Sequence, residues 1–389
     1  MKRSTLWVAV IGLLTGAAQA GESVAASASA APATRIEMGT AETMENPSVI
    51  MARRAQQAKA KDVEPYYDDT LDSAKTAVDT AYKAAKAKNG TLTKSAWVKA
   101  LATATDATSI YLLGATQWLG IGGPMKFAEA QKNFEAAAAL GSIAGKREYA
   151  KMILRGHVEK GQSQRGYELM TAIASADADA MVERGIALTD GYGVTKDRAE
   201  ARKCFEAAAA KGSSRANLWL ATLTTIQPDI TPEQKTAAVA YAKKASDAGQ
   251  VKAMRMYGMM VDQGYGVTKD QVTGSALILK AALAGEQDAQ FIMAQKYRYG
   301  IGVNQDPVEA LSWARTCAQY NNVQCMQSAG ELVLEVQPDG GDAMIKEAVR
   351  YVINMSTRDE AAAKSLVETL QSGTTMPFSE LMRMAGYNQ

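Results

Sequence analysis

Short glycine-containing turns divide the apolar and Ala-rich stretches of this chain at regular intervals. The sequence GYGVTKD stands at 191–197 and again at 264–270, and GIGVNQD stands at 300–306. With the Gly-Ile-Gly at 120–122, these turns keep a period of about 36 residues, which is typical of stacked-repeat architectures. Degenerate copies fall in step at 156, 227–228 and 337–341.

A second marker follows the same period, because Ala-rich runs end at Gly141, Gly212, Gly249 and Gly285. Each unit is therefore predicted to be a helix, a tight turn and a second helix. A glycine ends the first helix because it adopts positive φ without a Cβ clash.

The starts of the second helices carry their own signals. Asp197 with Glu200, and Asp306 with Glu309, have the spacing of a capping box. Pro307 and Pro232 are expected at the first helical position, where a missing N–H costs nothing.

The apolar pattern, small-x-x-x-large-Gly-x-x-large-x-x-Gly-x-Gly-Val-x-x-Asp followed by an Ala-rich helix, resembles the Sel1-like repeat, a longer relative of the tetratricopeptide repeat. The resemblance covers residues 106–335; it is strong at 185–212 and 258–325 and weak at 142–176 and 213–248. It implies an all-α fold, a right-handed α-solenoid of helix-turn-helix repeats whose first helices line a concave binding surface. It also implies an adaptor for other proteins, and some bacterial members are exported.

The N-terminal residues 1–20 have the layout of a secretory signal peptide. Lys2 and Arg3 precede an apolar run at 6–14, and Ala18-Gln19-Ala20 is a small-x-small cleavage site. We expect cleavage after Ala20 and a periplasmic or secreted protein. The alternative is an N-terminal membrane anchor, although the apolar run is short for a bilayer span.

The rest of the chain is predicted to contain four parts. Residues 21–47 are a flexible Ala/Ser linker, 48–105 an N-terminal helical cap or small domain, 106–335 the repeats, and 336–389 C-terminal repeat or cap helices. Helices are expected within 49–88, from 92 to 107, and at 342–356 and 358–372, with a break at Asn89-Gly90.

The net charge of the chain and its single histidine each argue against some classes of function. Without residues 1–20 the chain has 41 basic (43 less Lys2 and Arg3) and 41 acidic residues, so nucleic acid is not an expected partner. No membrane insertion is expected after the signal peptide is removed. His157 is the one histidine, and it is expected in a turn rather than in a metal or catalytic site. We expect neither cofactor nor enzymatic activity.

Two of the three cysteines are expected to form a disulfide. Cys317 lies near the end of one repeat and Cys325 near the start of the next, and their spacing is similar to the bridge of cysteine-rich secreted Sel1 proteins. An exported chain meets an oxidising compartment. Cys204 is interpreted as a buried small apolar residue or, alternatively, as a free thiol open to an intermolecular bridge.

If the repeats pack as the resemblance implies, three positions of each first helix line the concave face. The expected lining residues are Tyr111, Arg147, Val182, Leu218, Arg255 and Phe291; Ala115, Lys151, Ile186, Thr222, Met259 and Gln295; and Trp118, Leu154, Thr189, Thr225, Asp262 and Arg298. The predicted partner-binding residues among them are Tyr111, Trp118, Arg147, Lys151, Arg255, Met259, Phe291 and Arg298.

These aromatic and basic side chains favour a protein or peptide partner of acidic character. The predicted function is an exported, non-enzymatic scaffold. Two alternatives stay open: a cell-envelope hydrolase or glycan-binding protein on the same repeats, related to peptidoglycan or β-lactams, and a secreted factor that acts on host proteins.

Overall fold

The computed structural model describes residues 72–157, 161–227, 229–320, 322–336, 342–356 and 358–373. These residues form seventeen helices, α3 to α19, and contain no strand. They all belong to one compact unit, residues 67–389. The predicted all-α solenoid fold is confirmed.

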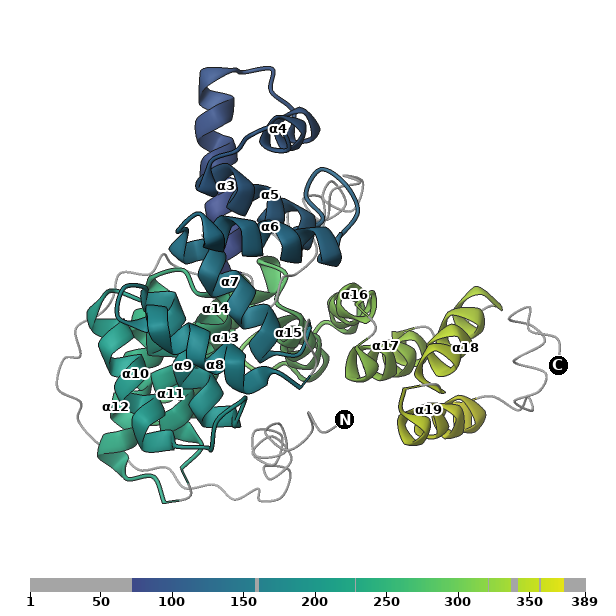
Figure 1. The fold of residues 1–389 in the computed structure, drawn as a ribbon. Coiled ribbons are helices and arrows are strands. Elements are labelled where there is room, and N and C mark those ends of the chain that lie inside the picture. Colours follow the sequence, from purple (N-terminus) through teal and green to yellow (C-terminus); the bar gives the residue numbers. More distant parts are fainter. Residues whose placement is uncertain are drawn as a thin grey trace. The chain divides into compact units, whose positions relative to one another are not determined.

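Seven helix pairs follow one another along the chain, and each helix packs against the next (Figure 1). The first helices of the pairs are α5 (Ala107–Leu119), α7 (Ile143–Leu154), α9 (Ala178–Asp190), α11 (Ser214–Thr225), α13 (Val251–Gln263), α15 (Gln287–Tyr299) and α17 (Val323–Val336). The second helices are α6 (Phe127–Ala139), α8 (Ser163–Ala174), α10 (Arg198–Ala210), α12 (Pro232–Asp247), α14 (Gln271–Leu283), α16 (Pro307–Ala318) and α18 (Asp342–Ser356).

In α5, α9 and α13 the first helix meets its second helix closely because a glycine stands at the crossing. A Cβ on Gly185 of α9 would lie 2.5 Å from the ring of Phe205 on α10. Gly258 and Ile278 repeat this arrangement in α13 and α14, with a Cβ distance of 2.8 Å. The large side chain from the second helix fills the space that the glycine leaves, and both Phe205 and Ile278 are fully buried.

In the Gly-x-Gly turns after α9, α13 and α15, the second glycine fixes one repeat against the preceding one. Gly193 has φ +67°, and a Cβ there would lie 2.1 Å from the carbonyl oxygen of Ser163, the first residue of α8. The turn after α9 therefore packs onto the start of the previous repeat's second helix. This close approach explains why the Gly-x-Gly turn is a stacking element as well as a helix terminator.

The helix starts confirm the predicted capping residues Asp197 and Asp306, but the predicted reciprocal capping box at Glu200 does not form. Asp197 and Asp306 accept hydrogen bonds from the backbone N–H groups of Glu200 and Glu309, each at 2.9 Å. The Glu200 side chain, however, forms an ion pair with Arg184 at 3.2 Å. A reciprocal capping box forms instead between Thr231 and Gln234 at the start of α12. Pro232 and Pro307 begin α12 and α16 as predicted.

Two helices precede the repeats and one follows them. Helix α3 (Asp72–Lys88) ends where Asn89-Gly90 was expected to break it, and α4 (Lys94–Leu101) is shorter than the predicted helix at 92–107. The chain leaves the helix after α4 because the Asp106 carboxylate caps α5, accepting from the Ser109 N–H at 2.9 Å. At the other end α19 (Glu360–Gly373) packs on α17 and α18.

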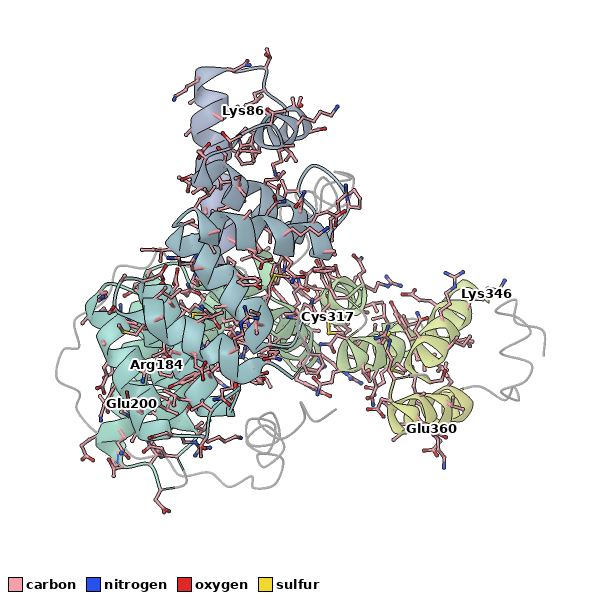
Figure 2. The ribbon with its side chains drawn as sticks, in the orientation of Figure 1. Lys86, Arg184, Glu200, Cys317, Lys346 and Glu360 are labelled. Atoms are coloured by element: carbon pink, nitrogen blue, oxygen red, sulfur yellow. A yellow bond between two sulfur atoms is a disulfide. The ribbon has the colours of Figure 1, made fainter. Side chains whose placement is uncertain are left out.

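The predicted disulfide between Cys317 and Cys325 is present, with 5.6 Å between the two Cα atoms (Figure 2). It joins α16 to α17, and both residues are fully buried. The signal peptide, the linker and the first part of the predicted cap lie outside the described residues. Among the helices described, none has the length and apolar character to cross a bilayer.

Candidate binding site

The first helices of neighbouring repeats contact one another: α5 contacts α7, α7 contacts α9, α9 contacts α11, and α15 contacts α17. This stacking brings side chains that lie one repeat apart in sequence into contact. It determines whether the predicted lining residues face solvent or each other.

The two aromatic residues predicted at the N-terminal end are buried. Tyr111 is 4% exposed and its ring lies 5.9 Å from that of Phe134. Trp118 is 7% exposed and makes T-shaped contacts with Phe127 and with His157, which lies in the turn after α7. These rings pack within the first two repeats and do not face solvent as open partner anchors would.

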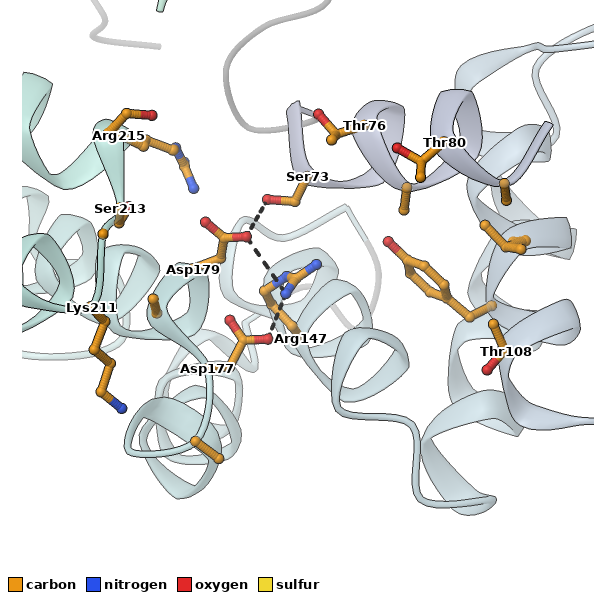
Figure 3. A pocket seen from close by; sticks show the side chains of 18 of the residues that line it. Ser73, Thr76, Thr80, Thr108, Arg147, Asp177, Asp179, Lys211, Ser213 and Arg215 are labelled. Carbon is orange, nitrogen blue, oxygen red and sulfur yellow. Dashed lines mark hydrogen bonds and ion pairs between the residues drawn. The ribbon is translucent and has the colours of Figure 1, made fainter. Parts of the chain in front are cut away.

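Arg147 on α7 is buried and bound to carboxylates. Its guanidinium lies 2.6 Å from Asp177 at the start of α9 and 3.8 Å from Asp179 (Figure 3). It also lies 3.2 Å from Glu148, its neighbour in sequence. Burial alone would lower the pKa of Arg147, but these carboxylates raise it. The arginine stays charged, and its charge is balanced inside the chain.

A second buried cluster surrounds Glu183 on α9. Its carboxylate lies 2.9 Å from Arg155 and 2.7 Å from Arg215, so it links α9 to the repeats on both sides. Burial favours the neutral acid, yet the attraction of Arg215, Arg155 and Lys151 lowers the pKa of Glu183 to about 2. Lys151 itself is buried and forms an ion pair with Glu148.

The same arrangement recurs three repeats later around Arg255 on α13. Arg255 lies 3.0 Å from Glu286, which caps α15, and 3.3 Å from Asp288. Its guanidinium also lies 3.8 Å from the Sδ of Met259. Burial, the largest effect, raises the pKa of Glu286 although Arg255 lowers it.

Helix α15 continues this series of ion pairs. Lys296 contacts Asp262 of α13 at 2.5 Å, and Arg298 contacts Glu331 of α17 at 2.8 Å and also pairs with Glu335. Arg147, Arg255, Lys296 and Arg298 therefore bind carboxylates at the cap of, or within, an adjacent first helix, whereas Lys151 pairs with Glu148 of its own helix.

The predicted lining residues consequently divide into two groups. In the first four repeats most are buried: Ala115, Leu154, Val182, Ile186, Thr189 and Leu218, together with Tyr111, Trp118, Arg147 and Lys151. Partly exposed positions are Thr222, Thr225, Arg255, Met259, Asp262, Phe291, Gln295 and Arg298. The accessible part of the predicted face lies mainly on α13 and α15.

A pocket of about 860 Å³ lies where α3 passes the starts of α9 and α11 (Figure 3). Helix α3 contributes Ser73, Thr76, Ala77, Thr80, Ala81 and Ala84. The opposite wall consists of residues 176–179 and 211–215 with Gln250, and Tyr111, Leu112, Thr108 and Arg147 complete the lining. Its volume falls in the range of ligand pockets.

The sequence pattern did not predict this pocket, although two predicted partner-binding residues, Tyr111 and Arg147, are part of its lining. Ser73, Thr76 and Thr80 stand at i, i+3 and i+7, so they share one face of α3. This row of hydroxyl side chains is the feature of the sequence that could have indicated a polar wall of the pocket. Ser73 donates a hydrogen bond to Asp179 at 2.7 Å and so connects α3 to the third repeat.

The buried Cys204 is the third cysteine. Its Sγ lies 3.2 Å from Arg184, and burial raises the pKa of its thiol despite that arginine. Cys204 is buried and lies outside the disulfide, as the first of the two interpretations of the sequence expected. Within the described residues, no group of three or more His, Cys, Asp or Glu side chains could hold a metal ion.

Helix pairs that stack along the chain define a repeat protein of the solenoid class. The Sel1 repeat model matches residues 107–142, 178–213, 227–250, 251–286 and 287–316. The chain therefore contains Sel1 repeats. The second repeat, α7 and α8, has the same helix pair although that model does not match it.

Two solved structures are similar to this chain. A Sel1 repeat protein from Oxalobacter formigenes shares 25% identity with a TM-score of 0.51, covering 61% of this chain and 94% of that one. The protein c5321, a protective antigen of uropathogenic Escherichia coli strains with an SLR fold, shares 19% identity with a TM-score of 0.42, covering 76% and 79%. A comparison with curated proteins found no match. Sel1-repeat proteins generally mediate protein–protein interactions and are typically non-catalytic.

Proposed function

We propose that this protein is an exported, non-enzymatic scaffold that binds protein or peptide partners on its first-helix face and the adjoining pocket. The observation that carries the proposal is the pocket of about 860 Å³ beside the stacked first helices. Binding at such a preformed surface needs no bond to be made or broken. Most of its affinity comes from a few well-placed side chains.

The partner surface of this proposal differs from the one expected from sequence. Arg147 and Lys151 are buried and paired with carboxylates, so they do not attract an acidic partner. The accessible residues are the partly exposed Met259, Phe291 and Arg298 on α13 and α15, and the pocket lined by α3. Nucleic acid is not part of the proposal, because the chain without residues 1–20 has no net charge.

Affinity capture tests the scaffold. The chain from Gly21 with a C-terminal tag is incubated with envelope extract, crosslinked and purified beside a tag-only control. We expect one or a few proteins to be enriched reproducibly. Recovery of the same proteins with the tag alone, or turnover of peptidoglycan or a β-lactam by purified protein, would contradict the proposal.

Export is tested separately by N-terminal sequencing of the protein made with its own residues 1–20 in a bacterial host. We expect a mature chain that starts at Gly21 and is released with the periplasmic fraction or the medium. A chain that retains Met1 and stays with the membrane fraction would indicate an anchor instead.

A further inference from the structure

The pocket beside α3 has a shape that suits a narrow, extended ligand. Its α3 wall runs from Ser73 to Ala84 and presents only Ser, Thr and Ala side chains. Eleven residues of helix rise by about 16 Å, which is the length of roughly five residues of extended chain. Because these side chains are small, another backbone can approach α3 closely.

The Tyr111 hydroxyl provides a hydrogen-bond donor that the fold itself does not use well. The side chain is 4% exposed and lines the pocket, and its hydroxyl has no hydrogen-bond partner of good geometry among the described residues. Burial, together with Glu148, raises the pKa of Tyr111, while Arg147 beside it acts in the opposite direction. The phenol is therefore protonated at neutral pH and able to donate to a carbonyl oxygen. Leaving a buried polar group without a partner costs free energy.

Hydrogen-bond acceptors and further donors lie along the same pocket. The Asp179 carboxylate accepts from Ser73 and is still about a third exposed (Figure 3). Thr76 and Thr80 are exposed on α3, and their hydroxyls both donate and accept. A pocket that holds both donors and acceptors can pair with the N–H and C=O groups of a peptide main chain.

The accessible charges of the pocket do not favour a charged ligand. Arg147 and Arg215 are buried and balanced by Asp177 and Glu183. Asp179 exposes a carboxylate and Lys211 exposes an ammonium group, so one charge of each sign faces the pocket. A glycan would usually stack on an open aromatic face, but the aromatic residue of the lining, Tyr111, is buried against Phe134.

We propose that the pocket between α3 and the starts of α9 and α11 binds an extended, uncharged peptide segment with small side chains, held mainly through its main chain. The inference rests on the proposed scaffold function and specifies where the partner binds and what kind of segment it presents. Its hydrogen bonds would come from Tyr111, Asp179 and the hydroxyls of α3.

Site-specific photocrosslinking locates the segment. A photoreactive phenylalanine analogue replaces Thr76 in the pocket or, as a matched control, Lys83, which is exposed on α3 but does not line the pocket. Expected are crosslinks from position 76 to a partner segment rich in Gly, Ala, Ser or Thr, and none from position 83. Equal crosslinking at both positions, or crosslinks to residues 21–71 of this same chain, would overturn the inference.

A synthetic peptide of the crosslinked segment then tests the contacts by fluorescence anisotropy. Thr80→Trp fills the pocket from an exposed position and should weaken binding more than tenfold. Tyr111→Phe removes only the hydroxyl and should weaken it by about fivefold, the value of one hydrogen bond. Tyr82→Phe is the control, because that hydroxyl binds the Leu92 carbonyl at 2.8 Å and does not line the pocket.

The outcomes separate the two proposals. If a partner is captured but its peptide binds wild type, Thr80→Trp and Tyr111→Phe equally, the pocket inference is wrong and the scaffold stands. If no partner is captured by the wild-type chain, the scaffold proposal fails and this inference fails with it.

Discussion

At the scale of single residues, the first helices are joined by buried ion pairs between adjacent repeats. Arg147 binds the carboxylate that caps α9, and Arg255 binds the one that caps α15. Each carboxylate thus caps its own helix and balances a cation of the previous first helix. Removing one partner of such a pair leaves a buried charge without compensation, which costs far more than an exposed pair contributes.

Glu183→Gln is expected to destabilise the fold by about 3 kcal/mol at pH 7, because Arg155 and Arg215 lose the carboxylate between them. Urea unfolding measures the difference. The control is Glu206→Gln on α10, an exposed carboxylate whose loss should change stability by less than about 0.5 kcal/mol. Equal effects of the two substitutions would show that the buried cluster contributes no specific stability.

The contribution of Glu183 should also depend on pH. Its folded pKa of about 2 lies below its ordinary value of 4.5, so its stabilisation is complete above about pH 4.5. It is lost as the pH falls toward 2, when the carboxyl is protonated in both states. The difference in unfolding free energy between wild type and Glu183→Gln should therefore shrink over this range. A difference that stays constant from pH 7 to pH 3 would contradict the assigned pKa.

At the scale of elements, each repeat is joined to the next by packing, and α16 is joined to α17 by a covalent bond as well. The Cys317–Cys325 disulfide has a sequence separation of 8 and lies in the core of the last repeats. A closed loop of this length restricts the unfolded chain only modestly. The chain-entropy model gives about 2.5 kcal/mol for it, before any native-state strain is subtracted.

Replacing both half-cystines, Cys317→Ala with Cys325→Ala, should lower stability by about 2.5 kcal/mol. Thermal unfolding with and without a reductant measures this: the reductant should lower the Tm of wild type and leave that of the double variant unchanged. Cys204→Ala is the control, because a variant without the free thiol should respond to reductant as wild type does. If the reductant also lowered the Tm of the double variant, its effect on wild type could not be assigned to the Cys317–Cys325 disulfide.

At the scale of the whole molecule, the described helices contact mainly their neighbours in sequence, as expected for a solenoid. The α9–α10 pair encloses Phe205, which also stacks on Trp219 of α11 at 5.7 Å. The loss of such a side chain affects the nearest repeats first. Neighbouring repeats can therefore open with a lower free energy than is needed to unfold the whole chain.

Phe205→Ala should cost about 3 to 5 kcal/mol and increase amide hydrogen exchange in α9 to α11 more than in α15 to α17. Hydrogen exchange measured by mass spectrometry resolves the two regions. The matched variant is Met293→Ala, a fully buried residue of α15, which should produce the opposite distribution. If both variants raised exchange uniformly along the chain, the repeats would unfold as one cooperative unit.

The sequence by itself determined the repeat period, the helix pairs and the cysteine bridge. These features depend on local chemistry: Gly191 ends a helix at positive φ, Asp197 caps the next one, and Gly185 leaves room for Phe205. Helix α18 begins and ends at the predicted residues because its limits are set by neighbouring residues along the chain.

Tertiary structure alone decided which side chains are accessible. Arg147 and Asp177 stand 30 residues apart, and nothing in the local sequence shows that stacking brings them within 2.6 Å. The pocket likewise required α3 to lie against the third repeat, through Ser73 and Asp179, which are 106 residues apart. Burial and charge pairing depend on how repeats stack, so the periodic pattern identified the first helices but not the surface they leave open.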